Sequence, residues 1–103
     1  MSEDNQAFIP DSFMALYVDP GRYKPRIGRA EMIRRYELCE DMANMLMDTA
    51  STQQFDLGIT PDDVLERCHR GLQGTPALVT EEESVWVICR LAELLNWPSP
   101  KLK

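Results

Sequence analysis

The sequence predicts an all-α fold, a small bundle of about four helices. Three observations lead to this prediction: a long stretch whose apolar residues recur at helical spacing, two strong helix-start signals, and no run of alternating residues long enough for a confident strand. The expected helices cover approximately residues 11–18, 29–51, 61–70 and 81–96, with a basic loop at 19–28.

The first helix is expected to be short. Pro10-Asp11-Ser12 offers a start signal, and Phe13, Leu16 and Tyr17 fall on one face at helical spacing. Asp19-Pro20-Gly21 then predicts a turn, because proline fixes φ at the first central position and glycine supplies the positive φ needed at the second.

The second helix is the longest, and apolar residues cover most of its circumference. Its seam, at alternating steps of four and three residues, is Met32, Tyr36, Cys39, Ala43, Leu46 and Ala50. The seam is widened by Ile33, Leu38, Met42, Met45 and Met47. An apolar arc this wide exceeds the stripe of an ordinary surface helix, so the helix is either central in its domain or shared with a partner. The methionines leave both readings open, since methionine fills irregular cores and also makes adaptable contact surfaces.

The last two helices carry the clearest boundary signals. Thr60 is placed to cap the first N–H groups of the third helix, and Gly71 is expected to end that helix as a left-handed cap. Thr80 and Glu83 have the spacing of a capping box at the start of the fourth helix.

Length and composition favour one soluble domain. A chain of 103 residues predicts a single helical domain over residues 10–97 between flexible tails at 1–9 and 98–103. No apolar run approaches the roughly 20 residues needed to cross a membrane, and the acidic, polar start lacks the pattern of a secretory signal. The three cysteines are odd in number and widely spaced, which favours a reducing compartment. We therefore expect a cytoplasmic protein without membrane association.

The net charge of −6 conceals a basic segment. Residues 20–35 hold six bases and one acid, whereas the rest of the chain holds five bases and sixteen acids. Such a segment can dock an anion or a partner, or it can be a solvated loop that pairs with acids of its own chain. Binding to nucleic acid is disfavoured by the overall acidity and by the three glutamates that begin helix 81–96, which phosphates would repel.

The fragments of the chain that come closest to chemical motifs have simpler explanations. The fragment at 71–75 lacks the spacing and the lysine of a phosphate-binding loop. Cys68 and His69 are adjacent, so on a helix they point about 100° apart and do not easily reach one metal ion. The acidic pairs at 62–63 and 81–83 suit the positive end of a helix dipole. We therefore expect no cofactor, no metal and no enzymatic activity.

Two stretches, FDLGITPDDVLER at 55–67 and RLAELLNWP at 90–98, resemble a family of short, uncharacterised proteobacterial proteins. Its members are sometimes labelled "ATPase with chaperone activity", and the resemblance covers most of the chain. The label implies a nucleotide site that this sequence lacks, so it is not carried over. The matching residues are helix caps and core positions, which imply a fold and supply no catalytic residues. At most the resemblance implies a partner in protein quality control.

The leading hypothesis is a non-enzymatic protein-interaction module whose partner is another protein or a second copy of itself. The apolar faces of the second and last helices would supply the contact, through Met32, Tyr36, Leu38, Met42, Met45, Trp86 and Leu94. The alternative is a nucleic-acid- or anion-binding protein that uses segment 22–35, with contacts from Arg22, Lys24, Arg26, Arg29, Arg34 and Arg35. An enzyme without recognisable motifs stays a third reading.

Overall fold

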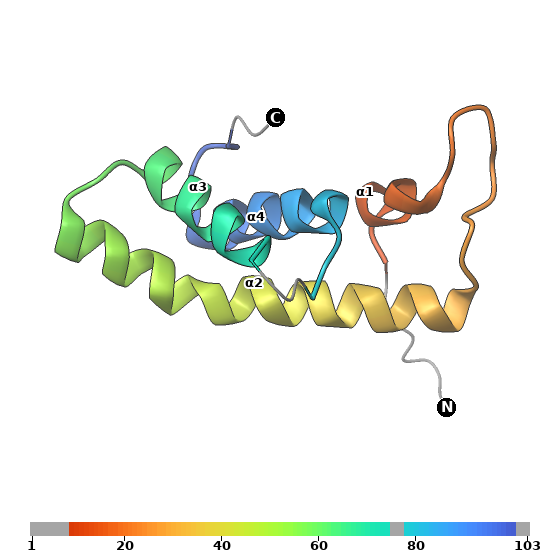
Figure 1. Ribbon diagram of the computed structural model, residues 1–103, viewed down its shortest axis with the longest axis horizontal. Helices are drawn as coiled ribbons and strands as arrows, with labels where there is room; N and C mark the ends of the chain where they lie inside the picture. The colour runs from red at the N-terminus through yellow and green to blue at the C-terminus, as the bar shows by residue number, and fades with distance from the viewer. Residues whose placement is uncertain (1–8, 75–77, 101–103) are drawn as a thin grey trace. The chain divides into compact units, whose positions relative to one another are not determined.

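A computed structural model describes residues 9–74 and 78–100, and within these ranges every regular element is helical. The elements are α1 (Asp11–Met14), the 3-10 turn η1 (Ala15–Tyr17) that follows it directly, α2 (Arg29–Leu57), α3 (Pro61–Leu72) and α4 (Glu81–Leu95) (Figure 1). The predicted all-α fold is confirmed.

The chain divides into two compact units, residues 1–38 and 39–103, and α2 contributes residues to both. The single domain over residues 10–97 stays a prediction. Of the two expected tails, residues 1–8 and 101–103 lie outside the described residues. Ile9, at the end of the first expected tail, is buried.

The unit formed by residues 1–38 has an aromatic centre. Phe13 is fully buried, and its ring lies 5.5 Å from the rings of both Tyr17 and Tyr36, measured between centroids. The Tyr36 ring meets it edge-on at 72°, an arrangement that aligns the positive ring edge with the negative ring face. Met32 of α2 is also buried.

The loop after η1 begins with the predicted turn. Gly21 has a φ of 78°, and the N–H of Arg22 donates to the carbonyl of Asp19 at 3.0 Å. Both features are those expected of a turn with glycine at its second central position. Further along the loop, the N–H of Arg26 donates to the carbonyl of Tyr17 at 2.8 Å.

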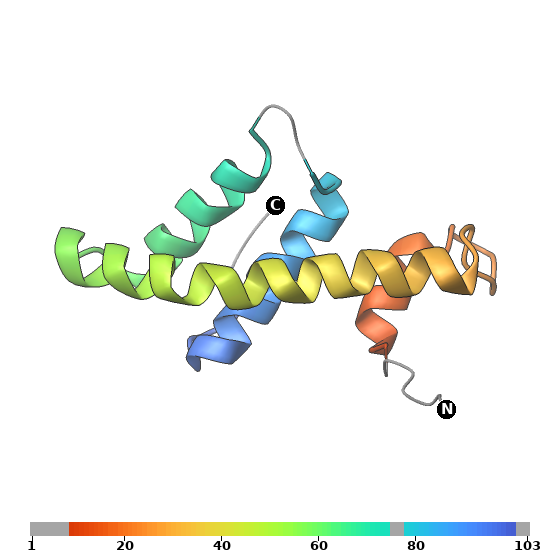
Figure 2. The ribbon, with the colours of Figure 1, turned by 90° about the horizontal axis from the view of Figure 1, so that it is seen from below.

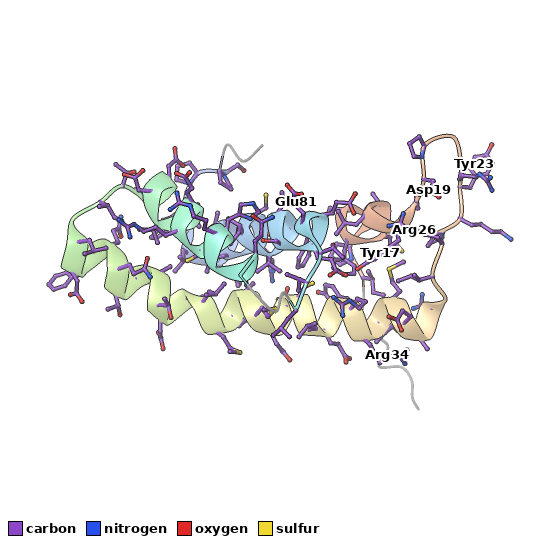
Figure 3. All side chains as sticks on the ribbon, viewed as in Figure 1. Tyr17, Asp19, Tyr23, Arg26, Arg34 and Glu81 are labelled. Carbon is purple, nitrogen blue, oxygen red and sulfur yellow. The ribbon has the colours of Figure 1, made fainter. Side chains whose placement is uncertain are left out.

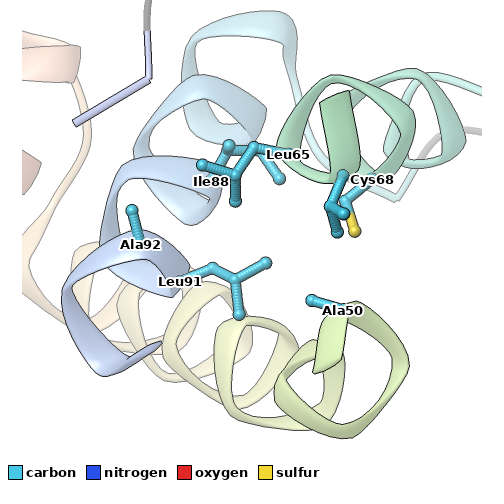
Figure 4. Packing of buried hydrophobic residues seen from close by; sticks show 7 residues of the cluster. Ala50, Leu65, Cys68, Ile88, Leu91 and Ala92 are labelled. Atoms are coloured by element: carbon cyan, nitrogen blue, oxygen red, sulfur yellow. The ribbon is translucent and has the colours of Figure 1, made fainter. Parts of the chain in front are cut away.

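The unit formed by residues 39–103 is a three-helix assembly with one apolar core. In Figure 2, α4 crosses α2 instead of running alongside it. The core contains Ala50 of α2, Val64, Leu65 and Cys68 of α3, and Ile88, Leu91 and Ala92 of α4, which converge in Figure 4. Each fully buried leucine or isoleucine contributes about 1.5–3 kcal/mol relative to exposure. Leu46, Met47 and Trp97 are among the half-buried residues that pack against this core.

The two threonine caps form as predicted. The Oγ1 of Thr60 accepts the N–H of Asp63 at 3.2 Å. At the start of α4, the Oγ1 of Thr80 accepts the N–H of Glu83 at 3.0 Å, and a carboxylate oxygen of Glu83 accepts the N–H of Thr80 at 2.9 Å. The capping box is therefore complete, with Glu83 buried within it.

Two predicted helix ends differ from the structure. α2 was expected to stop near residue 51 but continues to Leu57, because Gly58 is the first residue after it that ends a helix readily. Gly58 has a φ of 64°, and its N–H donates to the carbonyl of Gln54 at 2.9 Å, which closes the helix end. The predicted cap at Gly71 is wrong, since α3 continues through it to Leu72.

An ion-pair fork joins α4 to α2 within the second unit. The Nε and Nη2 of Arg90 each donate to the Glu40 carboxylate at 3.0 Å, and Nη1 donates to Glu93 at 3.0 Å. The hydrogen bond to Glu40 is the main reason that the pKa of Arg90 is raised.

Candidate interaction surface

The seven side chains predicted to face a partner differ in exposure. Met32 and Trp86 are buried and therefore offer no surface for docking, while Met45 is 73% exposed. The remaining four are half-buried, namely Tyr36, Leu38, Met42 and Leu94. Of the four that belong to the second unit, only Met45 presents most of its area to solvent. These residues do not form one exposed apolar patch.

A different pair of apolar side chains stands out at the junction between α2 and α3. Phe55 is 87% exposed and Leu57 is 53% exposed, both in the last turn of α2. Ile59, two residues further on, is half-buried against the core. Gly58 ends α2 and Thr60 caps α3, so both ends of this short connection are fixed by hydrogen bonds, one to the carbonyl of Gln54 and one to the hydroxyl of Thr60. We call Phe55, Leu57 and Ile59 the α2–α3 corner.

The outer face of α3 continues from this corner. It consists of Asp63, Glu66, Arg67 and Arg70, which lie opposite the buried side of the helix because their positions follow the helical repeat. Together with Ile59 they line an open hollow of about 290 Å³. Arg70 pairs with Glu66 at 3.1 Å, and both side chains are more than half exposed. The hollow therefore has an apolar edge and walls of both charges, an arrangement suited to polar side chains of a partner.

The spacing of polar residues in the sequence indicates that Phe55 is exposed on α2. The exposed residues Asn44, Asp48 and Ser51 precede Phe55 at steps of four, three and four, which marks the solvent side of α2. The predicted helix stopped at residue 51, so Phe55 fell in a supposed loop. A helix continued to Gly58 places Phe55 on the solvent side, where a large aromatic residue is unusual.

The basic segment is partly neutralised within the first unit. Arg26 pairs with Asp19 at 2.9 Å and lies over the Tyr17 ring at 5.8 Å, and Arg34 pairs with Glu31 at 2.6 Å (Figure 3). Arg35 is half-buried and already engaged in an interaction. The other three predicted contacts are exposed and make no ion pair with any described residue: Arg22, Lys24 and Arg29.

Tyr23 lies between two of these exposed bases. It is 95% exposed and projects from the loop in Figure 3. An aromatic ring therefore lies in solvent beside two exposed bases.

A histidine–serine pair connects α3 and α4. The Nδ1 of His69 lies 2.8 Å from the Oγ of Ser84. Ser84 is fully buried, so its hydroxyl cannot be reached by a substrate in this conformation. The pair satisfies two polar groups at the helix contact, which is the usual role of a buried hydrogen bond.

The cysteines and acids do not assemble into a metal site within residues 9–74 and 78–100, where no group of three or more ligand-type side chains could hold an ion. Cys68 lies in the core of the second unit, and burial raises the pKa of its thiol. Burial, and secondarily the charge of Glu93, raises the pKa of Cys89. Neither thiol is activated as a nucleophile by these surroundings. No helix in the described ranges has both the length and the apolar character needed to span a membrane.

Comparisons with protein-family models, with curated proteins and with solved structures find no match for this chain. The resemblance to the short proteobacterial family therefore stays a prediction. Several of the residues that carry it serve the fold here, because Thr60 caps α3 and Leu91 and Ala92 are buried in the core.

Proposed function

We propose that this chain is a protein-interaction module that docks its partner at the α2–α3 corner and along the outer face of α3. The observation that carries the proposal is the exposure of Phe55 and Leu57, at 87% and 53%, shortly before Ile59 in the chain, whose side chain lines the hollow with charged walls. Phe55 and Leu57 are two positions apart and therefore point about 200° apart around α2, so a partner at this helix end would contact each of them separately. Aromatic residues are also enriched among the interface residues that contribute most to affinity.

The energetics favour contact of moderate strength. Full burial of a phenylalanine and a leucine contributes about 1.5–3 kcal/mol each. Both residues belong to a capped helix, so docking costs little backbone entropy. The charged walls would add specificity and accelerate association more than they would add affinity.

Site-specific photo-cross-linking in the native cell tests this proposal. Benzoylphenylalanine in place of Phe55 preserves an aromatic side chain there, and the same group in place of Asp41 is the control. Asp41 is an exposed α2 residue, fourteen positions and roughly 21 Å along the helix from Phe55. We expect a discrete cross-linked protein from position 55 and none from position 41. The absence of any discrete product from position 55 would overturn the proposal.

A second candidate function is the binding of a polyanion by the basic segment. It is favoured by one observation, the exposure of Tyr23 between the exposed bases Arg22 and Lys24, because bases of single-stranded nucleic acid stack on aromatic rings within basic grooves. A salt-sensitive gel shift with single-stranded RNA, lost on changing Arg22 and Lys24 to alanine, would support it. The absence of a shift at low salt would exclude it.

A further inference from the structure

The charges along the outer face of α3 are separated by sign. The acids Asp63 and Glu66 lie toward the N-terminal half, and the bases Arg67 and Arg70 lie toward the C-terminal half. All four side chains are exposed. These four side chains therefore have no net charge together, but the N-terminal half of the face is negative and the C-terminal half is positive.

This separation distinguishes two ways of pairing the face with a copy of itself. In a parallel pair, acids would face acids and bases would face bases. In an antiparallel pair, the acidic half of each helix lies against the basic half of the other, and the two helix dipoles are also opposed favourably. A two-fold axis across the helix produces this arrangement, and two-fold dimers are the commonest oligomers.

We propose that the partner docked at this surface is a second copy of the chain, with α3 packed antiparallel against α3 about a two-fold axis. The inference rests on the proposed function, because it names the occupant of the same surface. The ion pair between Arg70 and Glu66 does not oppose it. Both side chains are largely exposed, and such a pair within one helix is weak enough to exchange its partners.

The apolar corner fits the same arrangement. Phe55 and Leu57 lie just before the N-terminal end of α3, so antiparallel packing brings them toward the C-terminal end of α3 in the second copy. Symmetry makes this contact twice, once at each end of the paired helices.

The area of this contact is expected to be small, so the dimer is expected to be weak. α3 has twelve residues, about 18 Å in length, so the paired faces and corners fall toward the low end of interface sizes. The dimer is therefore expected to dissociate on dilution and to weaken in high salt, because its charged contacts are exposed.

Charge reversal on separate chains tests the inference. One variant, Asp63→Asn with Glu66→Lys, makes the face basic, and a second, Arg67→Glu with Arg70→Gln, makes it acidic. We expect each variant alone to be monomeric by sedimentation velocity at a concentration where the wild type is dimeric. An equimolar mixture of the two should form a 1:1 dimer, at least about 10-fold tighter than either variant with itself. Glu81→Lys with Glu82→Gln, at two exposed α4 residues off this face, changes the net charge as much as the first variant does and should dimerise like the wild type.

Three results would overturn the inference: a wild type that stays monomeric up to about 1 mM, variants that dimerise as the wild type does, or folded variants that fail to pair when mixed. If either variant does not fold, the salt dependence of the wild-type dimer tests the inference. Its dissociation constant should rise at least about 10-fold between ionic strengths of about 0.01 M and about 1 M, and no change would overturn the inference. A position-55 cross-link to a different protein, with a monomeric wild type, would overturn this inference while supporting the proposed function.

Discussion

At the scale of single residues, Arg90 joins α4 to α2 through a forked ion pair. Its guanidinium donates through two nitrogens to Glu40, which lies fifty positions earlier in the chain, and through the third to Glu93. Arg90 and Glu40 are only 33% and 23% exposed, so this pair is less screened by water than the surface pairs are. Contact with the Glu40 carboxylate through two nitrogens requires a planar guanidinium group, which lysine lacks.

We expect Arg90→Lys to lower the free energy of unfolding by about 1–2 kcal/mol, because it loses the two-nitrogen contact with a half-buried carboxylate. Arg34→Lys, at an exposed pair with Glu31, is the matched control and should change stability by less than about 0.5 kcal/mol. Urea denaturation of both variants measures the difference. Equal effects would show that the fork contributes no more than a surface pair.

The buried thiols predict a loss of stability at alkaline pH. Burial raises the pKa of Cys68 and of Cys89 in the folded chain. Below the thiol pKa of the unfolded chain, about 8.5, both thiols are protonated in the folded and the unfolded chain, and stability is not reduced. As the pH rises toward the raised folded pKa, the unfolded chain releases its protons first, so stability falls.

We therefore expect stability to decrease more steeply between about pH 8 and pH 10 for the wild type than for Cys68→Ala with Cys89→Ala. The comparison uses the slope alone, because removing a buried side chain also lowers stability at every pH. Titrating tyrosines and lysines are common to both proteins. Parallel slopes in urea midpoint against pH would contradict the expectation.

At the scale of helices, two glycines that look alike in sequence have opposite roles. Gly58 has a φ of 64° and ends α2, a conformation that is costly for a residue with a side chain. Gly71 lies inside α3 with ordinary helical geometry, and a Cβ added there would meet no atom within 4 Å. Neither role is visible from the residue type.

Alanine at each glycine gives a matched pair of variants. Gly58→Ala should destabilise the protein by about 1–2 kcal/mol, because it forces a left-handed conformation on alanine. Gly71→Ala should stabilise it by up to about 1 kcal/mol, because alanine is the better helix former. Thermal unfolding of the two variants should therefore shift in opposite directions, and a shift in the same direction would contradict the helix ends described here.

The sequence predicted those features that depend on local chemistry. The caps at Thr60 and Thr80, the turn at Gly21 and the existence of each helix follow from residue types at short spacing. The contact between Arg90 and Glu40 was not predictable, because their separation of fifty residues carries no local signal. The candidate surface was missed for a related reason: one misplaced helix end moved Phe55 from a helix face into a loop.

At the scale of the whole molecule, the proposed docking surface is largely separate from the residues that form the core. The core of residues 39–103 is built from inward-facing side chains of three helices. Phe55, Leu57 and the outer face of α3 lie outside that core and carry exposed side chains, whereas Ile59 packs against it. Changes at the surface should therefore affect association without affecting folding.

Phe55→Ser with Leu57→Ser should abolish dimer formation while changing the free energy of unfolding by less than about 0.5 kcal/mol. Met45→Ser, which removes an equally exposed apolar side chain elsewhere on α2, is the control and should retain the dimer. Sedimentation velocity and urea denaturation of the same samples provide both readouts. If Met45→Ser loses the dimer while Phe55→Ser with Leu57→Ser retains it, the dimer contact lies at Met45 and not at the α2–α3 corner.

The most direct test of the docking surface is the comparison of photo-cross-links from positions 55 and 41 in the native cell. We expect a discrete product from position 55, with the mass of two chains when the partner is a second copy, and no product from position 41. No discrete product from position 55, or the same products from both positions, would contradict a docking site at the α2–α3 corner.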